Sequence, residues 1–188
     1  ITDLYVPAAA RVLGDRWCED NMSFADVTIG SARLQSLLRW VGPEWQPGWK
    51  TPVNAPLVLV YVRPDEYHTL GAMVATGQLR RAGCEVLLHI GYDRAETLDV
   101  IEREPIDIVM ISASGGERLE SVRKLIEDMR KRADDTISIA VGGSILLNYD
   151  DVRSLTGADY AEQDPKKVLR LCGVKIQASA VDLSGTKN

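Results

Sequence analysis

A short loop after the first apolar run combines residue types that can hold a metal ion. It reads Arg63-Pro-Asp-Glu-Tyr-His-Thr-Leu-Gly71 and places His68 two residues after Glu66. A neutral imidazole binds metals through one ring nitrogen, and a carboxylate can orient the ring by accepting a hydrogen bond from the other. Glu66 and His68 are therefore a candidate ligand pair. The alternative, an ordinary loop histidine, stays open.

Two further loops carry small residues at comparable places. Ser112 and Ser114 follow one apolar run, and Gly142 and Gly143 end the next. Because glycine has no side chain, a flat ligand can approach its backbone closely. Glycine is equally a common turn residue, so a purely structural role remains an alternative here.

Other chemistry has little support in the sequence. GxSxG, GxxxxGK[ST] and HExxH are all absent, and we do not expect an enzyme. The two histidines are far apart, and Cys18, Cys84 and Cys172 show no CxxC spacing, which disfavours a zinc or iron site built from protein ligands alone. A metal at His68 is therefore expected to arrive inside a macrocycle. His89, in the middle of an apolar run, is expected to be structural.

After Pro56, short apolar runs alternate with amphipathic segments. The predicted strands are 57–62, 85–90, 107–112, 138–141 and 159–161, and the predicted helices are 71–82, 95–104, 117–132, 145–155 and 165–171. The strands are almost continuously apolar, as in parallel sheets covered on both faces. Five βα units in a row predict an α/β fold with a doubly wound, five-stranded parallel sheet of the Rossmann or flavodoxin-like type. Ligands of such sheets bind beyond the carboxyl ends of the strands, where the three loops lie.

The first part of the chain has a different composition. It contains all four tryptophans, Trp17, Trp40, Trp45 and Trp49. Helical periodicity over 7–40 predicts two helices, the second capped by Ser23, and a proline- and glycine-rich linker of extended backbone follows. We therefore divide the chain into a helical cap with its linker (1–55), an α/β domain (56–175) and a polar tail (176–188). The tryptophans are expected in the core of the cap, with an interface or a macrocycle as the alternative.

Charge and composition exclude several classes. With 22 Lys+Arg against 27 Asp+Glu, the net charge of -5 disfavours direct nucleic-acid binding. No apolar run approaches the length of a membrane span. Three cysteines without a pairing pattern indicate a reducing, cytoplasmic setting. The start at Ile1, without a targeting segment, indicates a piece of a longer protein.

Taken together, these loops have a known counterpart. Glu66-x-His68-x-x-Gly71, followed by Ser112 and by Gly142-Gly143 and preceded by Gly14-Asp-Arg-Trp17, resembles the cobalamin-binding domain of the methionine-synthase type with its helical cap, from about residue 4 to residue 172. Members carry Asp-x-His-x-x-Gly, whose histidine becomes the lower axial ligand of cobalt. The resemblance implies that His68 is a metal ligand. It also implies a set of cofactor-binding residues: Glu66, His68, Gly71, Ser112, Ser114, Gly142 and Gly143. Gly71 is expected to allow close helix packing.

The departures from this family resemble one of its offshoots. The Ser-x-Leu that helps to house the nucleotide tail reads Ser112-Ala-Ser114, and Val27-Thr28 stand where photoreceptor members have Glu-His. Both changes are similar to the "sensor containing heme instead of cobalamin" (SCHIC) domain of the photosynthesis-gene antirepressors of the AppA, PpaA and AerR type, AppA most of all.

That resemblance implies a regulatory domain without enzymatic activity. Such a domain binds a PpsR/CrtJ-type transcriptional repressor and senses redox or light through heme at His68, beside a flanking BLUF flavin domain. The alternative that the resemblance implies is a cobalamin-binding photoreceptor or a corrinoid methyl-carrier protein. A mutase-like enzyme subunit is disfavoured because no acid–base pair stands out.

Overall fold

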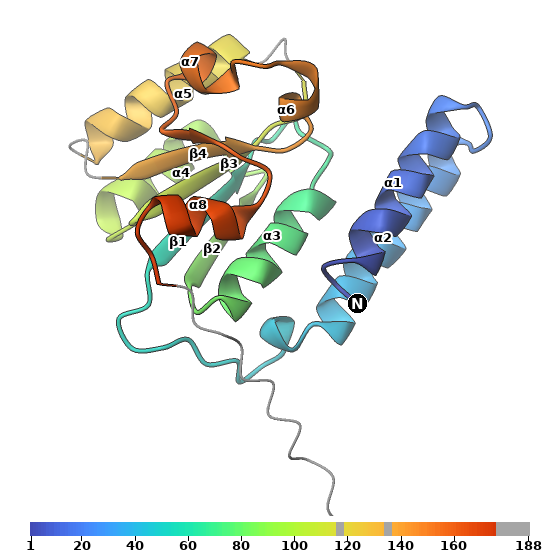
Figure 1. Ribbon diagram of the computed structural model, residues 1–188, viewed down its shortest axis with the longest axis horizontal. Coiled ribbons are helices and arrows are strands. Elements are labelled where there is room, and N and C mark those ends of the chain that lie inside the picture. Colours follow the sequence, from blue (N-terminus) through green and yellow to red (C-terminus); the bar gives the residue numbers. More distant parts are fainter. Residues whose placement is uncertain (116–118, 134–136, 176–188) are drawn as a thin grey trace, which may run out of the picture.

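The structure is a computed structural model that describes residues 1–115, 119–133 and 137–175 (Figure 1). The predicted polar tail lies outside the described residues. The strands are β1 Leu57–Val62, β2 Glu85–Ile90, β3 Ile108–Ser112, β4 Ser138–Gly142 and β5 Tyr160–Ala161. The helices are α1 Tyr5–Cys18, α2 Phe24–Val41, α3 Leu70–Arg81, α4 Arg94–Arg103, α5 Leu119–Arg132, α6 Ile145–Asn148, α7 Val152–Thr156 and α8 Pro165–Leu171.

The five strands form one parallel sheet in the order β2-β1-β3-β4-β5. Helices cover both of its faces, so the predicted doubly wound fold is confirmed. Every residue of β1 is buried, which explains the unbroken apolar run in the sequence. The order of strands reverses at β1, and the crevice for ligands in such a sheet opens at that point, between the carboxyl ends of β1 and β3.

The two faces of the sheet have separate cores. Alternate residues of β1, such as Leu59 and Tyr61, pack with α4 and α5 on one face. The residues between them, Val58 and Val60, pack toward α3 and α8 on the other face. This alternation is the period of two expected of any strand. Because β1 contributes to both cores, the loop that follows it begins between the two helical layers.

Some predicted boundaries differ from the structure. The single helix expected over 145–155 is two short helices, α6 and α7, because Tyr149, Asp150 and Asp151 between them favour turns. The linker, expected to be extended, contains a 3-10 helix over Pro43–Trp45. The last strand is only two residues long. The first two residues of the helix expected over 117–132 lie outside the described residues.

The cap consists of α1 and α2, which form a hairpin against α3 (Figure 1). Val6 and Leu38 are its buried residues, and they pack with Met73 and Val74 of α3. As predicted, Ser23 caps α2: its hydroxyl accepts a hydrogen bond from the backbone N–H of Asp26 at 3.2 Å, and the Asp26 carboxylate accepts one from the Ser23 backbone. None of the helices among the described residues has the length and apolarity that a bilayer crossing requires.

A buried ion pair fastens the cap to the α/β domain. The side chain of Glu44, in the linker, is fully buried and pairs with Arg81 at the end of α3. Arg81 also pairs with Asp3, just before α1. Next to this pair, the guanidinium of Arg80 lies 4.7 Å from the ring centroid of Trp45, a cation–π contact.

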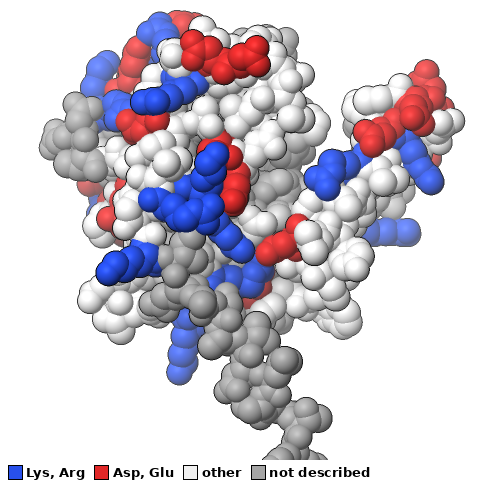
Figure 2. Space-filling model, viewed as in Figure 1, with Lys and Arg blue, Asp and Glu red and all other residues white. Residues whose placement is uncertain are grey.

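Most of the tryptophans do not lie in the cap core, contrary to expectation. Trp40 is 80% exposed, Trp17 47% and Trp49 38%, and only Trp45 packs against buried residues. Two helices bury just one stripe each when they pack on a single neighbour, so their remaining apolar residues face solvent. Figure 2 shows uncharged surface along the hairpin, interrupted by basic residues below its tip, with acidic residues at the tip itself.

Candidate functional site

The candidate ligand pair lies in the loop between β1 and α3. Glu66 is 5% exposed, whereas the side chain of His68 is 74% exposed. Oε1 of Glu66 accepts a hydrogen bond from the backbone N–H of His68 at 2.9 Å and lies 2.7 Å from Nδ1 of the His68 ring. Because a carboxylate is only an acceptor, Nδ1 is the donor in this contact, and the neutral tautomer that fits it carries its proton on Nδ1. The lone pair is therefore on Nε2.

Ser114 holds the other oxygen of Glu66. Oε2 accepts hydrogen bonds from the backbone N–H of Ser114, at 3.1 Å, and from its hydroxyl. Burial by itself raises the pKa of the Glu66 carboxyl, but the hydrogen bonds from Ser114 and His68 outweigh burial and hold that pKa below its ordinary value. Glu66 is consequently a charged, fixed acceptor beneath an accessible imidazole.

This arrangement can supply one strong axial ligand. The carboxylate fixes the tautomer of His68 and orients its ring, as a carboxylate hydrogen-bonded to a metal-binding histidine does. Among the described residues, no three His, Cys, Asp or Glu side chains gather to hold a metal ion. The donor set present, one oriented imidazole, fits a metal whose other ligands come from a macrocycle.

Gly71 lies in the first turn of α3, three residues after His68. A Cβ added there would meet nothing within 4 Å, so the expectation of close helix packing at Gly71 is wrong. Open space beside His68 is what a ligand approaching that histidine needs. A part for Gly71 in a ligand site stays a prediction.

The structure gives Gly142 and Gly143 a packing reason. Gly143 has a φ of +99°, and a Cβ added there would collide with the carbonyl oxygen of Ala113. A Cβ on Gly142 would meet the carbonyl oxygen of Glu162 at 2.9 Å. The structural alternative for these glycines therefore accounts for both, and their contact with a ligand stays a prediction.

The fold brings the predicted residues from three loops to one edge of the sheet. Ser112 pairs with Gly142 in the register of β3 and β4, and the backbone N–H of Ala113 donates to the Gly142 carbonyl at 3.0 Å. Ser114 contacts Glu66 from the same loop. The sequence predicted this gathering but not the hydrogen bonds from Ser114 to Glu66. Those hydrogen bonds could have been anticipated from a sheet in which β1 and β3 are neighbours, because the loops that follow these two strands then lie side by side.

The cap also contacts this loop, a relation that the sequence did not predict. Nε2 of Gln35, on α2, donates a hydrogen bond to the hydroxyl of Thr69 at 2.9 Å. Thr69 directly follows His68. Tyr67, on the other side of His68, is 88% exposed. The two residues that flank His68 therefore differ: Thr69 is hydrogen-bonded to the cap, and Tyr67 faces solvent.

Sequence comparison identifies related proteins. Residues 56–167 match the family described as "B12 binding domain". A protein of Rhodobacter capsulatus described as an uncharacterized 20.5 kDa protein in the bchF-crtJ intergenic region is 30% identical over 165 residues, which cover 88% of this chain and 86% of that protein.

Solved structures with the same fold come from corrinoid proteins. The monomethylamine corrinoid protein of Methanosarcina barkeri superimposes with a TM-score of 0.71 at 14% identity, over 88% of this chain and 78% of that chain. A cobalamin-binding protein from Desulfitobacterium hafniense DCB-2 gives a TM-score of 0.54 at 18% identity, over 90% and 78% of the two chains. The methanol:cobalamin methyltransferase complex MtaBC of Methanosarcina barkeri gives a TM-score of 0.55 at 18% identity, over 100% of this chain and 74% of that chain.

Proposed function

The chain belongs to the B12 binding domain family, and from that membership we propose that it is a regulatory domain that binds a corrinoid through Nε2 of His68. The observation that carries this proposal is the buried Glu66 carboxylate at 2.7 Å from Nδ1 of an exposed histidine. His68 would hold a bound corrinoid, which would supply the chemistry of its cobalt ion. The part of this chain is to hold the His68 ring oriented and accessible.

The family supports cobalamin as the cofactor. Heme, which the likeness to SCHIC domains implies, uses the same axial histidine and is the second arm of the test below. The two cofactors place different demands on Ser114, since only cobalamin carries a nucleotide tail. In this structure the Ser114 hydroxyl is bonded to Glu66, so Ser114 acts first as the residue that positions the carboxylate.

We propose further that the domain acts on a CrtJ-type repressor as an antirepressor, without enzymatic activity of its own. Three observations support this partner. The relative from Rhodobacter capsulatus is named for its position beside crtJ. The net charge of -5 favours binding to the basic surface of a DNA-binding protein over binding to DNA. The cap offers exposed aromatic side chains, Trp40 and Phe24 among them, of the kind enriched in interfaces.

Titration with hydroxocobalamin and, separately, hemin tests the cofactor. The wild type and His68→Ala are followed by absorbance, with His89→Phe, a change at the other histidine, as the matched control. We expect the wild type and His89→Phe to bind hydroxocobalamin alike, and His68→Ala to bind at least tenfold more weakly and without the spectral change. Equal binding by His68→Ala would refute the ligand assignment, and preference for hemin would replace the corrinoid by heme.

A second experiment tests the partner independently. A purified CrtJ-type repressor on its operator DNA is titrated with this chain in a gel-shift assay, with and without cobalamin. Release of the DNA by the wild type, and at least tenfold weaker release by Trp40→Glu, is the expected result. Arg123→Glu, a change at an exposed position on α5, is the control for added negative charge. Unchanged DNA binding would remove the antirepressor role and leave the cofactor assignment intact.

A further inference from the structure

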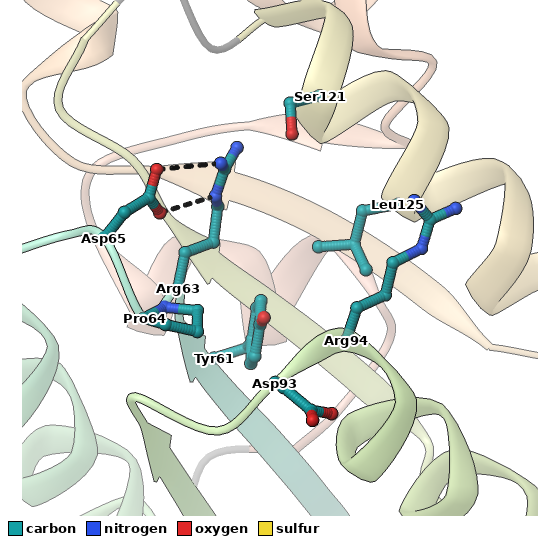
Figure 3. A pocket seen from close by; sticks show the side chains of 8 residues that line it. All are labelled: Tyr61, Arg63, Pro64, Asp65, Asp93, Arg94, Ser121 and Leu125. Atoms are coloured by element: carbon teal, nitrogen blue, oxygen red, sulfur yellow. Dashed lines mark hydrogen bonds and ion pairs between the residues drawn. The ribbon is translucent and has the colours of Figure 1, made fainter.

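A cavity of about 280 Å³ lies at the carboxyl end of β1, on the face covered by α4 and α5 (Figure 3). Tyr61 and Leu125, members of the core on that face, contribute to its wall. Arg63 reaches it from the loop after β1 and Arg94 from the start of α4. The cavity is thus built from elements other than α3, which begins just after the His68 loop.

The guanidinium of Arg63 is only partly satisfied by the residues that the structure describes. Its Nε and Nη2 donate to the two carboxylate oxygens of Asp65 at 3.1 and 3.0 Å. This bidentate pair fixes the plane of the guanidinium. Nη1 is buried and has no hydrogen-bond partner among the residues that the structure describes. A buried cationic donor without an acceptor is costly, so an acceptor from outside the described chain is the expected complement.

The other charged groups of the cavity are already engaged. Oδ1 of Asp93 accepts a hydrogen bond from the backbone N–H of Glu96 at 2.8 Å and caps α4. Arg94 pairs with Asp128 and also donates to the carbonyl oxygen of Lys124 at 3.4 Å. Neither Asp93 nor Arg94 is a hydrogen-bond partner of Nη1 of Arg63.

Further unsatisfied polar atoms lie on the same side of the sheet. Of five buried side-chain atoms without a partner among the described residues, three are Nη1 of Arg63, Nδ1 of His89 and Oγ1 of Thr97. His89 is the register partner of Tyr61, and Thr97 lies on α4, which covers this face. Three such atoms on one face of the sheet differ from an ordinary core, in which buried polar groups are paired.

We propose that this cavity binds the anionic group of a small molecule, a carboxylate or a phosphate, through Nη1 of Arg63. Figure 3 shows the Ser121 hydroxyl directed toward the same space as the Arg63 guanidinium, where it is placed to give a second hydrogen bond. Arginine is suited to such anions because its planar fork presents donors in fixed directions. The volume of about 280 Å³ is close to the lower end of small-molecule pockets, roughly 300–1,000 Å³, and therefore suits a small anion. The site is independent of a cofactor at His68.

Titration of the 188-residue chain with inorganic phosphate and, separately, with malonate tests the proposal by NMR, through the side-chain Nε–H resonance of Arg63. We expect a saturable shift with one of these probes. Arg63→Gln should bind that probe at least tenfold more weakly, whereas Arg123→Gln, at an exposed arginine of α5, should bind as the wild type does. If Arg63→Gln does not fold, Arg63→Lys, which keeps the charge and loses the fork, should still weaken binding several-fold.

The same titration on His68→Ala separates the two sources of such an anion. A free small molecule binds His68→Ala as it binds the wild type, whereas an acidic group of a macrocycle held by His68 would be recruited only when His68 is present. Shifts that do not saturate with either probe, or equal affinity in Arg63→Gln, would overturn the proposal. A chain that did not bind a corrinoid would leave the proposed anion site at Arg63 unaffected.

Discussion

The buried carboxylate of Glu66 and the backbone N–H of Ser114 lie 3.1 Å apart, although they are 48 residues apart in the chain. Their hydrogen bond spans the crevice where the order of strands reverses, between the loops that follow β1 and β3. The Glu66 side chain thus links the two loops through Ser114 and at the same time orients the His68 ring. The first prediction concerns that side chain.

Glu66→Gln should lower the free energy of unfolding by about 1–3 kcal/mol at pH 7, because its amide group places donors against the donors of Ser114 and His68. The pKa of Glu66 lies below its ordinary value of 4.5, so its stabilisation is present above pH 4.5 and is lost as pH falls through the lower, folded-state pKa. Urea unfolding at pH 7 and pH 3 should show the difference from wild type shrinking at pH 3. Glu102→Gln, at an exposed ion pair, is the control and should change stability by less than about 0.5 kcal/mol. An equal loss at both pH values would contradict the charged role of Glu66.

His89 should make the stability fall on mild acidification. Burial lowers the pKa of His89 below its ordinary value of 6.5, although the nearby Glu96 acts in the opposite direction. The unfolded chain therefore binds a proton below pH 6.5 that the folded chain resists, and stability decreases from there downward until the folded-state pKa is reached. In His89→Phe, which keeps the stack on the Tyr92 ring 4.2 Å away, unfolding free energies between pH 7 and pH 5 should fall less steeply. If the unfolding free energies of the wild type and His89→Phe changed with pH at the same rate, His89 would not titrate in this range.

The cysteines should differ sharply in reactivity. Cys84 is completely buried, and burial raises the pKa of its thiol to about 11, so the reactive thiolate is scarce. Cys18 is exposed at the end of α1. Iodoacetamide followed by peptide mass spectrometry should modify Cys18 in the folded protein and Cys84 only after unfolding in urea. Rapid labelling of Cys84 under native conditions would show that the sheet opens readily at the start of β2.

Arg81→Gln should destabilise the protein by about 3–5 kcal/mol, because it leaves the buried Glu44 carboxylate without its cation. The linker should also become accessible to limited proteolysis. Adding Glu44→Gln should restore much of the loss, since the double variant buries no unpaired charge. A double variant as unstable as the single one would mean that packing, and not charge, fastens the cap. Urea unfolding of the four proteins in this cycle makes the comparison.

The sequence was sufficient for the layers and the strand pattern because both follow from local periodicity. The apolar runs at 57–62 and 85–90 coincide with β1 and β2, and Ser23 caps α2 as expected. Where local signals compete, the prediction was weaker. The polar segment around Asp150 ends α6 early, and β5 shrinks to the two residues that pair with β4.

What the sequence did not predict depends on contacts between distant segments. The bonds from Ser114 to Glu66 and from Gln35 to Thr69 require knowing which loops and helices are neighbours. The exposure of Trp40 requires knowing that only one side of the hairpin has a partner. That Nη1 of Arg63 has no partner among the described residues depends on the direction of the Asp65 side chain, which periodicity does not encode.

The hydrogen bond from Gln35 to Thr69 gives the molecule a short mechanical linkage. One peptide unit separates the proposed ligand from a contact with α2, and α2 continues from Gln35 to the exposed Phe24 at its far end. Any displacement of His68 that lengthens this bond tilts α2 about its fastening at Glu44. The Phe24 end of α2, which is farther from Glu44 than Gln35 is, would then swing through a larger arc than the loop itself, so a small movement at the edge of the sheet becomes a change in the surface that other molecules meet.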